Sequence, residues 1–376
     1  MTDLVTTMKH RLRAPISQSV LILAGALLGL YIASFAYLQP VFDVAGDAPG
    51  YLQTMRVMNG SIEQPEAFTP NRILTTFLST GSVSLLGGIT GNYLASWFFI
   101  NTLYFFGLAF VCFFLFRRVT GSDTGSILGA LFVVGNYDVI VFGLNYLMDL
   151  TGWFWFTLSL LFLFKHVDRE VREGNSYLWL AVLAAGLGGL FKEYAYFAFI
   201  PIGLFLIWEH WRSPLHLIKR SVPFAIAAIV PTVLVHIGVY LIYGYTYLDW
   251  YGMNTSTFAF GGWLWNFSRS ILVVLSLLLP VALLGLRAFI LEMRATPDPR
   301  RILFVATLVV PALAVLLWPI ITERLVFLVV PLAGLLAAYA VKRYERHWPW
   351  FGFVWLLYVI LACVTDGLIL SKLYAW

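Results

Sequence analysis

The sequence has little charge for its length. Only 11% of its 376 residues are Asp, Glu, Lys or Arg, whereas a soluble domain carries about 25%. A chain with so few charged residues cannot cover a folded domain with a surface suited to water. The composition therefore excludes a soluble enzyme, a disordered chain and a nucleic-acid-binding protein.

Motifs for redox, nucleotide and metal chemistry are also missing. The two cysteines, Cys112 and Cys363, both lie in apolar runs and imply no disulfide framework. No glycine-rich phosphate loop or Walker motif is present, which argues against a nucleotide site. His236 has no second histidine or cysteine at ligand spacing, so we predict neither a metal site nor a cofactor.

What the sequence does contain is long apolar runs. A helix needs about 20 apolar residues to cross the hydrocarbon core of a bilayer. We therefore predict an all-α polytopic membrane protein, with residues 1–376 forming a single transmembrane domain and no soluble domain. The eleven runs that predict spans are 17–38, 93–116, 125–143, 150–165, 177–191, 195–211, 221–243, 264–286, 302–320, 325–341 and 351–371.

A twelfth run, 72–90, is weaker because it is rich in Ser, Thr and Gly. Cytoplasmic loops carry the excess of Lys and Arg in membrane proteins. If 72–90 does not cross and the N-terminus is inside, three quarters of the 24 Lys and Arg residues fall on the inner side. We therefore expect 72–90 to be a re-entrant or surface helix on the outer face, with the C-terminus outside. The basic charge then follows from topology.

Two outer segments stand out. The longest, 39–92, includes the predicted surface helices, and an extramembrane segment of this length in a tight protein is more often functional than idle. The second, 244–263, is rich in Tyr and Trp. These aromatics fit either an interface belt or a lid that stacks on a sugar or guides a prenyl chain, and the sequence leaves both open.

Several charged residues lie within a residue or two of the predicted outer span ends, namely Asp149, Lys192, Glu193, Glu323 and Arg324. Charged groups at membrane depth are costly, so a functional role is the default hypothesis. We expect them to line one outward-facing cavity. The alternative is that Lys192–Glu193 and Glu323–Arg324 are structural ion pairs between helix ends.

The first outer loop adds two more acids, Asp43 and Asp47. Pro49 and Gly50 favour a turn before a short helix that starts near Tyr51, and this turn would direct Asp47 toward the membrane surface. The alternative is that both acids only cap that helix. Arg72 belongs to the same region and has its own alternative role as an interfacial snorkelling residue.

Five motifs, in order along the chain, resemble the GT-C glycosyltransferases, which are polytopic enzymes that use lipid-phosphate-linked sugars. They are GDAPGYL, with Asp47 and Tyr51; Arg72 at the start of the weak helix; NYLMDLTGWF, with Asp149; FKEYAYF, with Lys192 and Glu193; and ITERLVFLVVP, with Glu323 and Arg324. The resemblance implies a GT-C-like fold in the inner or plasma membrane. It also implies inverting transfer from a polyprenyl-phosphate sugar to a glycan, lipid or protein acceptor at the periplasmic or lumenal face.

The chemistry of such a transfer suggests roles for these residues. A carboxylate can take the acceptor proton, and we predict Asp47 as this base, with Asp43 as second choice. Cations must stabilise the leaving phosphate. The candidates for substrate binding are Arg324, Lys192 and Arg72 for the phosphate, and Tyr51, Asp149, Glu193 and Glu323 around them.

Other functions fit part of the same pattern. A transporter or flippase of lipid-linked or polar solutes would use acids and cations along a pathway. A polysaccharide polymerase or ligase would use diphosphate-linked sugars. The polar residues gather on one face, and no matching pair of broken helices suggests alternating access, so the sequence favours the transferase.

Overall fold

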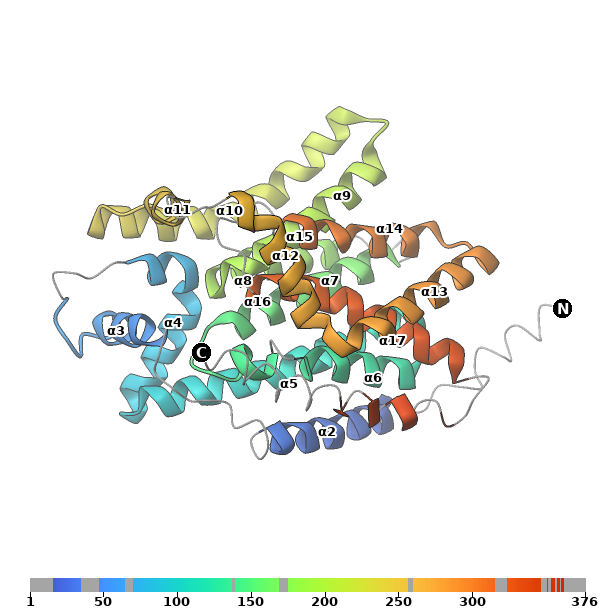
Figure 1. Ribbon diagram of the computed structural model, residues 1–376. Helices are drawn as coiled ribbons and strands as arrows, with labels where there is room; N and C mark the ends of the chain where they lie inside the picture. Colours follow the sequence, from blue (N-terminus) through green and yellow to red (C-terminus); the bar gives the residue numbers. More distant parts are fainter. Residues whose placement is uncertain are drawn as a thin grey trace.

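The fold is helical throughout the part of the chain that can be described. The computed structural model describes residues 16–34, 47–64, 70–136, 139–168, 175–255, 260–314 and 323–345, and single positions between 350 and 361. No strand occurs in these residues, which confirms the all-α prediction (Figure 1). The α-helices are α2 (Ile16–Ala33), α3 (Ala48–Met58), α4 (Asn71–Thr90), α5 (Tyr93–Thr120), α6 (Asp123–Val134), α7 (Asp149–Val167), α8 (Ser176–Phe191), α9 (Phe199–His210), α10 (Pro214–Tyr243), α11 (Tyr247–Thr255), α12 (Phe260–Leu275), α13 (Leu279–Ala295), α14 (Pro299–Thr307), α15 (Val309–Ala314), α16 (Glu323–Val326) and α17 (Val330–Tyr344).

The core forms where α5, α6, α7, α8, α13 and α17 pack together (Figure 1). Small residues let α6 and α17 approach closely. A Cβ atom on Gly125 would stand 2.5 Å from the carbonyl oxygen of Ala338, and one on Gly129 would stand 2.6 Å from that of Gly334. Since lipid is as apolar as the side chains, close backbone packing of this kind is what holds helices together in a membrane.

Five helices in the described residues are long and apolar enough to cross a membrane: α4, α5, α7, α10 and the segment Phe327–Tyr344. A sixth span results if α12 and α13, which meet at 87°, count as one. We predicted eleven, a number that the described residues do not confirm, and several of the predicted spans are interrupted, as two examples show. The 125–143 run leaves the α-helix at Val134, and the 264–286 run breaks at Ser276, whose φ of 33° is left-handed.

Helix α4 covers the run that we predicted as a re-entrant or surface helix. It resembles a membrane span in length and apolarity, but it is also partly buried in the protein. The helix has 20 residues, and half of it is buried. It is kinked at Thr76 (φ −147°, ψ 35°), where the Thr76 hydroxyl donates to the carbonyl of Arg72. Length and hydropathy do not assign a side of the membrane, so the outer placement of α4 stays a prediction.

We expect a reporter that is active only outside the membrane to be active when fused after Gly60 and after Ser84, and silent after Asp123. The reason is the bias of Lys and Arg, which places the loop after α5 inside only if α4 does not cross. The measurement is reporter activity normalised to the amount of fusion protein. Silence after Ser84 together with activity after Asp123 would show that α4 crosses.

Candidate active site

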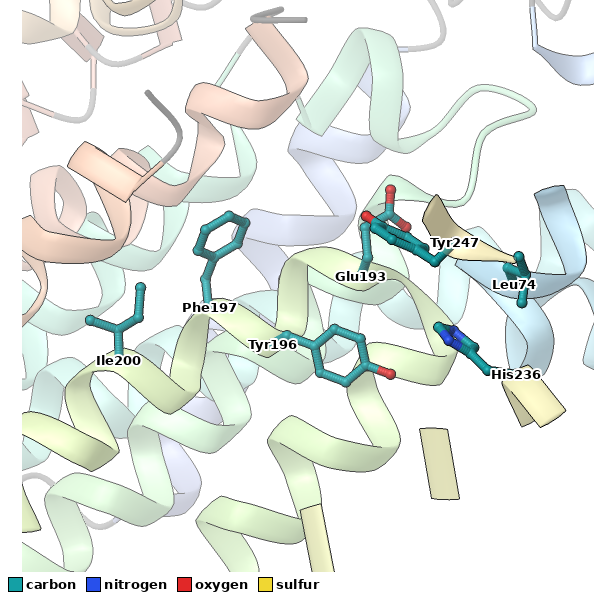
Figure 2. A pocket seen from close by; sticks show the side chains of 7 residues that line it. All are labelled: Leu74, Glu193, Tyr196, Phe197, Ile200, His236 and Tyr247. Atoms are coloured by element: carbon teal, nitrogen blue, oxygen red, sulfur yellow. The ribbon is translucent and has the colours of Figure 1, made fainter. Parts of the chain in front are cut away.

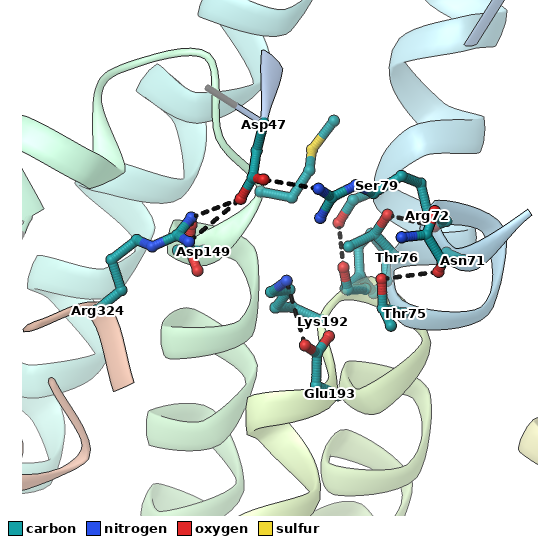
Figure 3. Close-up of polar contacts among 12 residues, drawn as sticks. Asp47, Asn71, Arg72, Thr75, Thr76, Ser79, Asp149, Lys192, Glu193 and Arg324 are labelled. Carbon is teal, nitrogen blue, oxygen red and sulfur yellow. Dashed lines mark hydrogen bonds and ion pairs between the residues drawn. The ribbon is translucent and has the colours of Figure 1, made fainter. Parts of the chain in front are cut away.

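Charged residues from five separate segments meet in one cluster (Figure 3). Asp47 precedes α3, Arg72 lies in the first turn of α4, and Asp149 is the first residue of α7. Lys192 and Glu193 lie where α8 ends and the 3₁₀ helix η3 (Glu193–Ala198) begins, and Arg324 lies in α16. Residues that are up to 277 positions apart in the sequence are therefore in direct contact.

Asp47 lies between two arginines. Its Oδ1 accepts a hydrogen bond from Nη2 of Arg72 at 2.7 Å, and its Oδ2 accepts from both Nη1 and Nη2 of Arg324 at 3.2 Å. Asp47 is the N-cap residue of α3, but its side chain makes no capping hydrogen bond. Pro49 in the first turn lacks an N–H, which leaves fewer donors to cap. The carboxylate is therefore engaged by cations, and the capping alternative does not describe it.

Arg324 joins Asp47 to a second acid. Its Nη1 lies 3.3 Å from Oδ2 of Asp149, a side chain that is fully buried. Oδ1 of Asp149 has no hydrogen-bond partner among the described residues. A buried carboxylate without compensation is costly, so Arg324 is the group that makes the burial of Asp149 tolerable.

Tyr51 brings the other two cations together. Its buried hydroxyl accepts from Nη1 of Arg72 and from Nζ of Lys192, each at 3.4 Å, and the Arg72 guanidinium lies 4.6 Å from the centre of its ring. Lys192 also lies 3.3 Å from Oε1 of Glu193 and 5.0 Å from the ring of Tyr194. Three cations thus converge around Asp47 and Tyr51.

The chain segments that carry these groups are held by buried polar contacts. The Tyr51 ring packs edge-on against Trp97, whose Nε1 donates to the carbonyl of Leu147 just before Asp149. Ser79 of α4 donates to the carbonyl of Phe191 at 2.6 Å and bonds to Thr151 of α7 at 2.8 Å. The polar residues that weaken the apolar run 72–90 therefore join α4 to the ends of α7 and α8.

Neighbouring charges shift the pKa values of Asp47, Lys192 and Arg324 in the direction that favours their ionised forms. Partial burial by itself would raise the pKa of Asp47, but Arg72, Arg324 and Lys192 together lower that pKa below its ordinary value of 3.8. Burial would lower the pKa of Lys192, but Glu193 and Tyr51 raise it well above the usual range. The charge of Asp149 raises the pKa of Arg324. Three cations face three carboxylates, so the group is close to electroneutral.

The structure brings together seven of the nine residues that we predicted from the sequence: Asp47, Tyr51, Arg72, Asp149, Lys192, Glu193 and Arg324. Asp43 lies outside the described residues, and the side chain of Glu323 is not described although its backbone opens α16. Lys192 pairs with Glu193 where α8 ends and η3 begins, which is the ion pair that the structural alternative supposed. Arg324 pairs with Asp47 and Asp149, and a pair between Arg324 and Glu323 stays untested because it would involve the Glu323 side chain. Arg72 forms an ion pair with Asp47, and its alternative interfacial role stays a prediction.

The sequence analysis did not predict a cavity that Glu193 lines. The cavity has a volume of about 330 Å³ and is lined by Leu74, Glu193, Tyr196, Phe197, Ile200, His236 and Tyr247 (Figure 2). His236 and Tyr247 gave only a weak signal, because a lone histidine in an apolar run and an aromatic loop are both common in membrane proteins. In the described part of the chain, no group of three or more His, Cys, Asp or Glu residues is arranged to hold a metal ion.

Comparison with known proteins gives one match. Residues 82–241 match the family model described as dolichyl-phosphate-mannose-protein mannosyltransferase. This match supports the resemblance to GT-C glycosyltransferases, and the family implies glycosyl transfer from a lipid-linked sugar. Together with the apolar helices it indicates a multi-pass membrane protein. The matched region contains Asp149, Lys192 and Glu193 but not Asp47, Arg72 or Arg324. No curated protein and no solved structure matches the chain.

Proposed function

We propose that this protein is an inverting glycosyltransferase that moves a sugar from a polyprenyl-phosphate donor to an acceptor at the outer face of the membrane. The observation that carries the proposal is the position of the Asp47 carboxylate, which lies between Arg72 and Arg324 and close to Lys192. A base and a set of phosphate-binding cations in one place are what this reaction requires. The family match over 82–241 supports the same reaction class.

The reaction is a single displacement. An acceptor hydroxyl oxygen attacks the anomeric carbon of the donor sugar, and its proton passes to a carboxylate oxygen of Asp47. The bond between the anomeric carbon and the phosphate oxygen breaks on the opposite side, and its electron pair stays on the phosphate. Arg324, Arg72 and Lys192 stabilise the charge that develops there. The arginines suit this role because a guanidinium contacts a phosphate with two N–H groups and does not lose its charge.

Donor binding would also prepare the base. In the free site the cations and carboxylates balance, and both oxygens of Asp47 are held by arginines. A phosphate that binds Arg72 and Arg324 competes with Asp47 for the same N–H groups. Asp47 then loses the charges that lower its pKa, so the carboxylate becomes a stronger base when the donor is present.

Two other functions use similar residues. A transporter or flippase needs charged groups along a path through the bilayer, whereas these seven groups lie together at helix ends. A polymerase or ligase that uses diphosphate-linked sugars would have a comparable site, and it differs in the leaving group that it releases. The transferase is favoured because residues 82–241 match a family that is described by a lipid monophosphate donor.

The test in cells is mass spectrometry of lipid-linked sugars and of envelope glycans, with and without the gene. We expect loss of the protein to raise the amount of one polyprenyl-phosphate sugar and to remove one sugar from an acceptor glycan, lipid or protein. The wild-type gene should restore both, and a gene carrying Asp47→Asn should restore neither. An unchanged set of glycans and lipid-linked sugars would contradict the proposal.

A further inference from the structure

We propose that the cavity next to Glu193 binds the transferred sugar of the donor, and that it selects an uncharged pyranose over an acidic one. This inference rests on the proposed function, because it assigns a place to the sugar of a lipid-phosphate donor. The cavity has a volume of about 330 Å³, which lies at the lower end of the range of small-molecule sites. It is therefore of the size expected for a single sugar unit.

The cavity lies next to the cations. Its wall includes Glu193, which directly follows Lys192 and whose Oε1 lies 3.3 Å from Nζ of Lys192. The charge of Glu193 also acts on Arg72 and raises the pKa of Tyr247, although burial is the larger cause of that increase. A phosphate bound by Lys192 would therefore have the cavity beside it, on the side of Glu193.

Glu193 presents an unused acceptor at this wall. The residue is 8% exposed, and its Oε1 pairs with Lys192 while its Oε2 has no hydrogen-bond partner among the described residues. A buried carboxylate oxygen without a partner is uncommon and costly. Sugar hydroxyls are donors that would satisfy it, whereas the hydrocarbon of a prenyl chain would leave it unpaired.

Four of the other six lining residues carry aromatic rings, as expected for a sugar site, and the remaining two are Leu74 and Ile200. The rings of His236 and Tyr247 are stacked with their centres 6.0 Å apart and their planes 11° apart (Figure 2). The Tyr196 hydroxyl is bonded to Thr232 of α10 at 2.5 Å, which fixes that ring in the wall. A pyranose has C–H faces that pack on aromatic rings and a rim of hydroxyls that meets polar groups, and this wall offers both kinds of contact.

The same carboxylate sets the selectivity. A sugar that carries its own carboxylate or a second phosphate would place like charges next to each other in a buried site, which is unfavourable. The positive charge of Lys192 does not remove this effect, because Lys192 already pairs with Oε1 of Glu193 and faces the donor phosphate. The cavity therefore favours neutral hexoses over uronic acids.

The experiment compares two lipids on the purified full-length protein, a short polyprenyl phosphate and its mannosyl ester. We expect Tyr247→Ala to weaken binding of the mannosyl lipid about tenfold and to leave binding of the polyprenyl phosphate within about twofold. Tyr247→Phe keeps the ring and should bind both lipids nearly as the wild type does. Binding of the unglycosylated lipid also shows that each variant is folded.

A second pair of lipids tests the selectivity. The wild type should bind the mannosyl lipid at least about tenfold more tightly than the glucuronyl lipid, and Glu193→Gln should narrow this difference. If Tyr247→Ala weakens both polyprenyl phosphate and its mannosyl ester equally, the cavity holds the prenyl chain and the inference is wrong. If Tyr247→Ala weakens the binding of neither lipid, the cavity does not bind the donor, and the inference is also wrong. The proposed function fails separately, if the wild type transfers no sugar from any of these donors.

Discussion

Replacing Asp47 with Asn is expected to lower the rate of sugar transfer about a hundred- to ten-thousand-fold. Asparagine has nearly the same shape but cannot accept the proton from the acceptor hydroxyl. Donor affinity should not fall, because Arg324 keeps its contact with Asp149, Lys192 keeps its contacts with Tyr51 and Glu193, and the carboxylate that competes with the phosphate for the arginines is gone. The measurement is the turnover of a synthetic polyprenyl-phosphate sugar by the purified variant, with donor affinity measured in parallel.

The matched control is Glu63→Gln, which removes an exposed carboxylate from the segment between α3 and α4 and should leave turnover unchanged. Asp43→Asn tests the second candidate for the base and should cost much less than Asp47→Asn. Because the pKa of Asp47 is lowered from 3.8, its carboxylate stays ionised in the free enzyme, and the wild-type kcat/KM should not fall through this group between about pH 7 and about pH 5. Near-normal turnover by Asp47→Asn, or a far larger loss in Asp43→Asn, would move the role of base away from Asp47.

Replacing Arg324 with Gln is expected to reduce both stability and transfer. Removing one partner of a buried ion pair costs about 3–5 kcal/mol, because the other charge is left without compensation. Here that charge is Asp149, which is fully buried and already has one oxygen without a partner. Transfer should also fall, since a main contact of the leaving phosphate is removed. The measurements are the unfolding midpoint in detergent and the turnover of the same preparation.

The double variant Arg324→Gln with Asp149→Asn separates these two effects. With both charges gone, no buried carboxylate is left unpaired, so we expect the unfolding midpoint to return most of the way to the wild-type value. Transfer should stay low, because the phosphate has still lost its arginine. If the double variant recovers its activity together with its stability, Arg324 acts only by holding Asp149 and not on the phosphate.

The grouping of the charged residues could be predicted from the sequence, because each lies at or near a predicted outer helix end. Outer ends of packed helices must lie close together, and a charge there is costly unless it meets an opposite charge. This argument is enough to predict that Asp149, Lys192 and Arg324 lie in the same region. It does not give the pairing, because the sequence equally allowed Arg324 to pair with its neighbour Glu323. Only the structure shows that the Arg324 side chain reaches Asp149 and Asp47.

The helix count was harder to predict than the site. Hydropathy treats an apolar run as continuous, so it joined residues 125–143 and 264–286 into single spans. The breaks after Val134 and at Ser276 depend on backbone conformations that hydropathy does not record. The cavity beside Glu193 was missed for a related reason. It forms where α4, η3, α9, α10 and α11 meet, and it depends on how these five segments pack together, which the sequence does not record.

The central claim is that the residues around Asp47 transfer a sugar from a lipid phosphate to an acceptor. The most direct measurement uses vesicles that contain the purified protein, labelled polyprenyl-phosphate mannose and a set of acceptors, and follows the label. We expect wild-type vesicles to release unglycosylated polyprenyl phosphate and to form a glycoside of inverted anomeric configuration, and Asp47→Asn vesicles to do neither. Movement of the intact labelled lipid from one leaflet to the other, with no glycoside formed, would contradict the claim and identify the protein as a transporter.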